Sequence, residues 1–235
     1  CHLRIRFAEG SFTGAEALRK RAHCIRIASE RSSGFFRNLL IVPGKRRRKQ
    51  HGEDILCGRR QECLTSAEAG AGFFAAGYDA CKSVFPDAIV MVHLDNGFDK
   101  DLYDYNLGVL KAGGAKWDMI GMSLYPYWAM EGHPEVEADQ VITDCIANIR
   151  RVSEKYGCDV MIVETGYEVN ESRPEVMEEG RRQLARVIRE ARTETNGRCR
   201  GVFYWEPQCN PHQYKLGAFD SKGTPTVIME GFVEE

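Results

Sequence analysis

Apolar positions after residue 70 alternate between continuous runs and stripes with helical spacing. The continuous runs are rich in β-branched residues and Met, and they predict strands buried on both faces: 88–93, 118–124, 160–163 and 201–205. The stripes between and beside them predict helices that end at Pro, Gly or polar residues: 73–84, 102–112, 139–156 and 174–194. Alternation of this kind is typical of a parallel sheet with helices packed outside it.

Two α/β architectures fit this alternation, a barrel and an open doubly wound sheet. No glycine-rich phosphate fingerprint follows any of the strands, which disfavours a nucleotide-binding open sheet. Polar and aromatic residues follow all four strands, as they do where a barrel gathers its chemistry on one face. The 235 residues are short for a complete barrel, which usually needs about 250. The fold class predicted is therefore a (β/α)8 barrel that is partial, with four readable strands.

The residues at the strand ends are the candidates for chemistry. At or just after the C-terminal end of the first strand they are His93, Asp95 and Asn96, of the second Ser123, Tyr125, Tyr127 and Trp128, of the third Glu164, and of the fourth Trp205 and Glu206. A carboxylate directly after an apolar run is costly unless it is solvated, paired or functional. An ion pair and a catalytic role are both open for Glu164 on this ground alone. Aromatic faces stack on the C–H faces of sugars, so a sugar site is the sharper interpretation.

Composition divides the chain at about residue 70. Residues 1–70 hold 15 Lys and Arg against 7 Asp and Glu, and every Tyr, Trp and Met lies after them. We interpret residues 1–70 as an anomalous basic segment, either an out-of-frame translation or a disordered stretch, and residues 71–235 as the half barrel. The alternative is a nucleic-acid arm around Lys45–Lys49. The segment has no Tyr or Trp for base stacking, so no nucleic-acid partner is expected.

Five strings after residue 70 carry a resemblance to a known family. They are VHLDNGFDKDLYDYNL, KWDMIGMSLYPYW, VMIVETGYE, GVFYWEP and YKLGAFDSKGTPT. Together they resemble the C-terminal half of glycoside hydrolase family 53, the endo-β-1,4-galactanases, over roughly residues 73–232. The resemblance implies strands five to eight of a (β/α)8 barrel. It also implies retaining endo-hydrolysis of β-1,4-galactan in the side chains of pectin, and a secreted or periplasmic location.

The resemblance also implies roles for individual residues. The VETGY string places the catalytic nucleophile on Glu164. Tyr125 and Trp205 match sugar-contacting positions, and His93, Asp95 and Asn96 match the substrate-binding end of the fifth strand. The acid/base of the family is the Glu of a Gly-Asn-Glu motif, which occurs nowhere in this chain. By spacing it would fall near residues 37–40, so the acid/base is not found and impaired activity is expected.

The remaining expectations concern partners. No cofactor is expected. Some members of the family that the chain resembles bind calcium in the loop after the seventh strand, but the corresponding loop at 167–174 lacks their Asp cluster, so no metal is expected. No run of about 20 apolar residues predicts a membrane span. The partner expected is a polysaccharide. Two further functions stay open: another retaining β-glycanase, such as a glucanase or mannanase, and a non-catalytic carbohydrate-binding half barrel.

Overall fold

The computed structural model describes residues 25–27, 39–43, 67–131 and 133–233. Most of the basic segment 1–70 lies outside these residues, and so do residues 37–38 of the predicted place of the acid/base, whereas residues 39–40 are described as part of a strand. The described chain falls into two compact units. The first comprises the residues up to His93 together with 103–119, and the second comprises 94–102 and 120–235.

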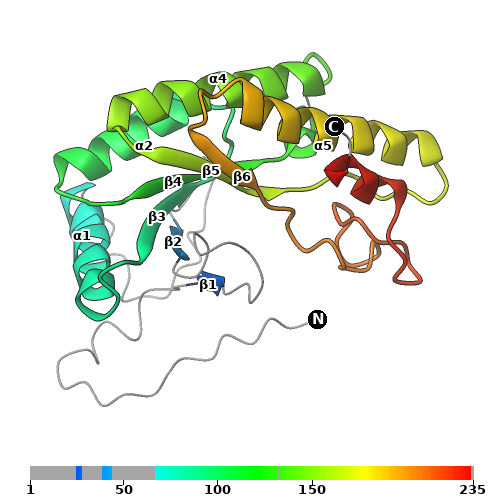
Figure 1. Cartoon of the computed structure of the whole chain (residues 1–235). Coiled ribbons are helices and arrows are strands. Elements are labelled where there is room, and N and C mark those ends of the chain that lie inside the picture. Colours follow the sequence, from blue (N-terminus) through cyan, green and yellow to red (C-terminus); the bar gives the residue numbers. More distant parts are fainter. Residues whose placement is uncertain (1–24, 28–38, 44–66, 132, 234–235) are drawn as a thin grey trace, which may run out of the picture. The chain divides into compact units, whose positions relative to one another are not determined.

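The first unit contains the early strands and two helices (Figure 1). Its elements are β1 (Ile25–Ile27), β2 (Leu39–Pro43), α1 (Ala67–Val84), β3 (Ile89–Leu94) and α2 (Lys100–Ala112). Leu94 at the end of β3 and residues 100–102 at the start of α2 belong to the second unit. β2 lies between β1 and β3, antiparallel to β1 and parallel to β3. The parallel register pairs Leu39 with Ile89 and Pro43 with His93.

The partly buried carboxylate of Asp118 links α1 to the strands of the first unit. Asp118 Oδ2 lies 2.8 Å from the Lys82 ammonium and accepts the backbone N–H of Val90 at 2.8 Å. Its Oδ1 accepts the hydroxyl of Tyr78 at 2.9 Å. The Lys82 ammonium also donates to the carbonyl of Ala88 at 2.6 Å. Because these groups come from one helix and two strand ends, Asp118 fixes the packing of α1.

The second unit continues the alternation of strands and helices. Its elements are β4 (Met119–Leu124), α3 (Pro126–Met130), α4 (Ala138–Tyr156), β5 (Asp159–Thr165), α5 (Pro174–Thr193), β6 (Cys199–Val202) and the 3₁₀ helix η2 (Val227–Phe232). The strands neighbour one another in the order β4-β5-β6, and β5 pairs with β6 in parallel. α4 and α5 lie together on one side of β5 and β6 (Figure 1).

The amphipathic stripe of α4 explains how that helix packs. Its apolar residues at helical spacing are all buried, as the sequence predicts: Ile142, Ile146, Ile149 and Val152. Gly157 ends the helix in the left-handed conformation with φ of 67°, and its N–H donates to the carbonyl of Ser153 at 2.9 Å. Glycine adopts that conformation without the steric cost that a side chain would add.

α5 begins at Pro174 and packs its apolar face against η2 and the loop after β5. The buried members of this cluster are Tyr167, Val169, Leu184, Ala218 and Ile228. Tyr204 packs against the same cluster, and its hydroxyl donates to the carbonyl of Gly217 at 2.5 Å. The C-terminal loop is therefore part of the core, so it has a fixed position beside the end of β5.

The predicted elements are present, most of them within a few residues, but α1 begins at Ala67 rather than at residue 73, and one strand is shifted. The fourth strand was expected at 201–205 but occupies Cys199–Val202. Its register with β5 is irregular between Val160 and Ile162, and Tyr204 leaves the ladder to pack in the core cluster. Trp205 therefore lies beyond the strand. No helix among the described residues is long and apolar enough to cross a membrane.

Candidate active site

Glu164 is the penultimate residue of β5, and two hydroxyl groups face its carboxylate. Ser123, 2% exposed and penultimate in β4, has its hydroxyl 3.0 Å from Glu164 Oε2. The hydroxyl of Tyr125, the residue after β4, lies 3.5 Å from the same oxygen. Both hydroxyls donate to Oε2, and no described residue forms a hydrogen bond to Oε1. The carboxylate is thus held by one oxygen while the other remains available.

Competing influences set the pKa of Glu164. Burial raises it above the ordinary carboxyl range, and the negative charges of Asp95 and Glu206 raise it further. The hydrogen bonds from Ser123 and Tyr125 favour the charged form and oppose this rise, but the net direction is upward. Glu164 has no ion-pair partner among the described residues, so the structural alternative of an Arg or Lys pair is not supported in this part of the chain.

Tyr125 and Tyr214 form a pair of phenols beside Glu164. Burial raises the pKa of Tyr125, which is 8% exposed, and the charge of Glu164 raises it further. Tyr214 lies close enough for its phenol to influence the pKa of Tyr125, and burial also raises the pKa of Tyr214. Both hydroxyls therefore keep their protons at neutral pH, so they can serve as donors to an oxygen in the site.

Close packing at the end of β5 fixes this arrangement. Thr165 is buried, and its hydroxyl donates to the carbonyl of Leu124 at 2.8 Å, which joins the ends of β5 and β4. A Cβ on Gly166 would lie 2.5 Å from the carbonyl oxygen of Leu216 and 3.2 Å from the ring of Tyr125. Only glycine allows the C-terminal loop to approach so closely. Tyr214 reaches the site because of this approach.

Asp95 and Asn96 form a tight corner after β3. The N–H of Asn96, whose φ is 48°, donates to Asp95 Oδ1 at 2.8 Å. The following Gly97 donates from its N–H to the carbonyl of Ser123 at 2.7 Å and accepts the side-chain amide of Asn148 at 2.8 Å. These bonds hold the corner against the end of β4, which places the Asp95 charge near Glu164.

Trp205 and Glu206 follow β6 at the rim. The N–H of Trp205 donates to the carbonyl of Thr165 at 2.9 Å, and the indole is 36% exposed. Glu206 has φ of 46°, an uncommon conformation for a non-glycine residue. A large, partly exposed indole beside a carboxylate suits contact with an amphipathic ligand such as a sugar.

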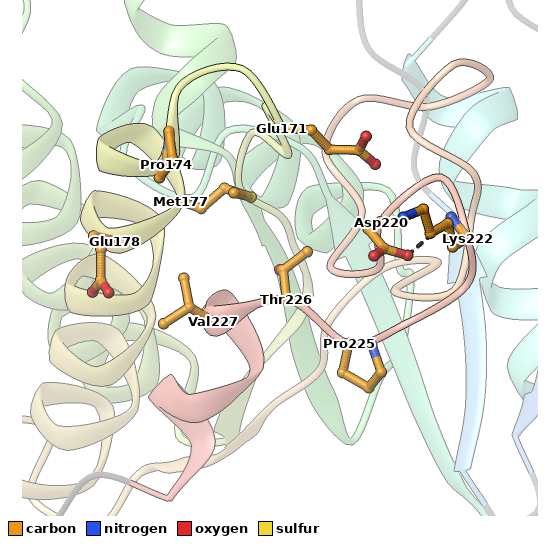
Figure 2. Close-up of a pocket in the computed structure, with 9 residues that line it drawn as sticks. All are labelled: Glu171, Pro174, Met177, Glu178, Asp220, Lys222, Pro225, Thr226 and Val227. Atoms are coloured by element: carbon orange, nitrogen blue, oxygen red, sulfur yellow. Dashed lines mark hydrogen bonds between the residues drawn. The ribbon is translucent and has the colours of Figure 1, made fainter.

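A separate pocket of about 490 Å³ lies away from Glu164. Figure 2 shows it between the start of α5 and the C-terminal loop, lined by Glu171, Pro174, Met177, Glu178, Asp220, Lys222, Pro225, Thr226 and Val227. Glu171 accepts the N–H and hydroxyl of Ser221, and Asp220 accepts the N–H groups of Lys222 and Thr224. Its carboxylates thus hold the loop. No group of three His, Cys, Asp or Glu suited to a metal occurs among the described residues.

The structure brings together three of the six predicted site residues: Glu164, Tyr125 and Asp95. Asn96 shapes the corner, Trp205 stands at the rim, and His93 is half-buried in β3 and belongs to the first unit. Three further groups were not assigned a role from sequence: Ser123, Glu206 and Tyr214. Ser123 and Glu206 could have been identified from the sequence as site residues, because both lie at the ends of predicted strands. Tyr214 lies in a loop without periodicity, so its signal was only its place at the start of the string YKLGAFDSKGTPT, which carries part of the family resemblance.

Comparison with known sequences gives a consistent family. Residues 54–226 match the model of glycosyl hydrolase family 53. An uncharacterized protein of Niallia circulans, from the bgaB 5′ region, is 30% identical over 200 residues, which are 75% of this chain and 51% of that protein. A probable arabinogalactan endo-beta-1,4-galactanase A of Aspergillus oryzae is 30% identical over 133 residues, 50% of this chain and 35% of that protein. The chain thus spans about half or less of these relatives.

Solved structures agree with the predicted fold class. A fungal beta-1,4-galactanase superposes with a TM-score of 0.59 at 18% identity, covering 73% of this chain and 56% of that one. The GH53 catalytic domain of Ignisphaera aggregans gives a TM-score of 0.55 at 20% identity, covering 70% and 51%. At these identities the likeness shows the fold alone. The chain has a partial (β/α)8 fold, as the alternation of its strands and helices predicted.

Proposed function

This chain belongs to glycosyl hydrolase family 53, and from that premise we propose that it carries the nucleophile side of a retaining β-glycosidase site. Glu164 is the nucleophile in this proposal. The observation that carries it is the carboxylate at the end of β5, with Oε2 held by Ser123 and Tyr125 and Oε1 left without a described hydrogen bond. A carboxylate oriented in this way presents one oxygen for attack.

The chemistry assigned to Glu164 is a displacement at the anomeric carbon of a sugar. Oε1 attacks that carbon, the bond to the leaving-group oxygen breaks, and a covalent glycosyl ester forms. Water then hydrolyses the ester and restores the carboxylate. Donation from Ser123 and Tyr125 opposes the rise in the pKa of Glu164 that burial causes, so these hydroxyls favour the charged form that attacks.

β-1,4-Galactan is the proposed substrate. Support comes from the relatives named as arabinogalactan endo-beta-1,4-galactanases and from the partly exposed indole of Trp205 at the rim. Within this proposal Trp205 stacks on a galactose ring, and Tyr125, Asp95, Asn96 and His93 contact sugar hydroxyls.

Hydrolysis of galactan by the 235-residue chain is proposed to be poor. The reaction needs a second carboxyl group about 5–5.5 Å from the first to protonate the leaving oxygen. The sequence holds no Gly-Asn-Glu motif to supply that group. General-acid assistance typically contributes about 10²–10⁴-fold, so its loss would leave the nucleophile able to act only on substrates whose leaving group needs no proton.

The nucleophile role of Glu164 can be tested by an experiment that does not depend on the acid/base. The full chain is incubated with a dinitrophenyl β-galactobioside that carries fluorine on the carbon next to the anomeric centre. The dinitrophenolate departs without a proton, and the fluorine slows hydrolysis of the ester. We expect a mass increase of one fluorogalactobiosyl unit on the peptide that contains Glu164, none in Glu164→Gln, and normal labelling in the neighbouring Glu168→Gln.

Each other outcome contradicts part of the proposal. Labelling of a different carboxylate would remove Glu164 from the nucleophile role. Galactan binding without any labelling would favour a non-catalytic carbohydrate-binding half barrel. Faster reaction of the matching cellobioside or mannobioside would favour a glucanase or a mannanase. Circular dichroism of each variant separates these outcomes from a failure to fold.

A further inference from the structure

A lysine covers two aromatic rings next to the candidate active site. Tyr127 and Trp128 lie in α3 with their ring centroids 4.9 Å apart in an edge-to-face arrangement. The Lys215 ammonium lies 4.1 Å from the Tyr127 centroid and 5.0 Å from that of Trp128, and it donates to the Tyr127 hydroxyl. We refer to these three residues as the basic platform. Contacts of this kind hold a cation in place at a modest energetic gain.

The chain on both sides of the basic platform leads directly to Glu164. Tyr127 comes two residues after Tyr125, and Lys215 directly follows Tyr214, the phenol that pairs with Tyr125. The carbonyl of Lys215 accepts the N–H of Val169 at 2.8 Å, and the next residue, Leu216, is fully buried. The backbone under the ammonium is therefore fixed, so the basic platform adjoins the site at a defined position.

The basic platform carries a positive charge, whereas the surroundings of Glu164 carry negative charges. Near Glu164 the neighbouring charged groups are the carboxylates of Asp95 and Glu206, which disfavour an anion there. At the basic platform, Glu131 is the one carboxylate partner of Lys215 among the described residues, at 4.0 Å, and the Lys215 and Glu131 side chains are 40% and 58% exposed. An exposed pair at that distance is weak. The ammonium thus keeps donors for an oxygen of a ligand.

We propose that the basic platform is a binding subsite for a sugar unit that carries a carboxylate, that is, a uronic acid. The proposal rests on the assignment of Glu164 as nucleophile, which places a neutral sugar beside the carboxylates of Glu164, Asp95 and Glu206. The next unit along the chain of sugars would reach the basic platform. Trp128, whose indole is 40% exposed, offers an apolar surface to the C–H groups of that unit, and Lys215 donates to its carboxylate.

The test measures binding by the full chain and needs no turnover. Isothermal titration calorimetry compares neutral β-1,4-galactotetraose with two singly oxidised forms. In one of them the C6 hydroxymethyl group of the non-reducing terminal unit is oxidised to a carboxylate, and in the other that of the reducing terminal unit. At low salt we expect one oxidised form to bind about three- to fivefold more tightly than the neutral form, the range of one exposed ion pair. This advantage should shrink at high salt.

Substitutions at Lys215 decide whether the basic platform is responsible. Lys215→Met, which keeps the aliphatic stem, should remove the advantage, and Lys215→Arg should retain it. Lys222→Met, at the separate pocket, should leave it unchanged. The proposal is overturned if no oligosaccharide binds, if neither oxidised form binds more tightly than the neutral one, or if the advantage survives in Lys215→Met. Labelling of Glu164 by the fluorinated glycoside is read independently, so its failure is distinguishable from these results.

Discussion

Removing the Ser123 hydroxyl should shift the pH dependence of Glu164 reactivity without removing the nucleophile. The hydroxyl donates to Glu164 Oε2 at 3.0 Å, and Ser123 is almost fully buried, so water cannot readily take its place. This bond favours the charged carboxylate and lowers the pKa of Glu164, against the larger effect of burial. In Ser123→Ala the pKa of Glu164 must therefore rise.

The size of the effect follows from the difference between two hydrogen bonds. A bond to a charged group contributes about 1.5–3 kcal/mol, and a neutral one about 0.5–1.5 kcal/mol. The charged form thus loses about 1–1.5 kcal/mol more than the protonated form when the hydroxyl is removed. Since 1.36 kcal/mol corresponds to tenfold in an ionisation constant, the acid limb of the reaction should move to higher pH by about one unit.

The assay is the rate of Glu164 labelling by the fluorinated dinitrophenyl glycoside, measured across pH for each variant. Ser153→Ala is the matched control, because Ser153 is equally buried and donates to the Arg150 carbonyl within α4. Well above the acid limb, Ser123→Ala should be labelled at nearly the wild-type rate. An acid limb that does not move in Ser123→Ala, or that moves equally in Ser153→Ala, would refute the reasoning.

Three further predictions use thermal unfolding and binding. The raised pKa of Glu164 means that its ionisation destabilises the fold as pH rises through that pKa, so Glu164→Gln should melt at a higher temperature than wild type at pH 7, and the difference should vanish in acid. Trp205→Ala should weaken galacto-oligosaccharide binding by about 1–3 kcal/mol in calorimetry; unchanged affinity with a lower melting temperature would make Trp205 a packing residue only. Asp118→Asn should cost about 1–3 kcal/mol in chemical unfolding because it replaces one of the two acceptor oxygens by an NH2 group and removes the charge that pairs with Lys82. Asp79→Asn, which breaks only an exposed pair with Lys116, should cost less than about 1 kcal/mol.

The sequence predicted those features of the fold that rest on local patterns. Continuous apolar runs are legible because a strand buried on both faces tolerates few polar residues, and this placed β3, β4 and β5 within a residue or two. The fourth strand was placed too late because its own residues, Cys199–Val202, include an exposed Arg, whereas three aromatic residues follow it, of which Tyr204 packs against the core cluster and Trp205 is exposed. Period alone cannot tell these uses apart.

The candidate site shows the same limit. Glu164 could be predicted as a site residue because a carboxylate at the end of an apolar strand is costly to bury, so its presence there indicates a structural or functional role. Tyr214 and Lys215 open one of the strings that carry the family resemblance, but the sequence did not show that they lie near Glu164, since their positions depend on how closely the C-terminal loop approaches β5 at Gly166. That approach is a tertiary contact between segments about 50 residues apart, for which the sequence has no local signal.

Opposing influences on the pKa of Glu164 explain why the hydroxyl donors Ser123 and Tyr125 matter for its reactivity. Burial beside Asp95 and Glu206 favours the protonated carboxyl, which cannot attack, whereas attack needs the anion. Ser123 and Tyr125 oppose protonation from one oxygen, and the high pKa that burial gives Tyr125 keeps its proton available for donation. In the proposed role, Glu164 on β5 is therefore prepared for attack by Ser123 on β4 and by Tyr125 in the loop that follows β4. It follows that the described part of the chain can hold a reactive carboxylate without the acid/base, and that leaving groups which need no proton are the substrates on which its reactivity should be sought.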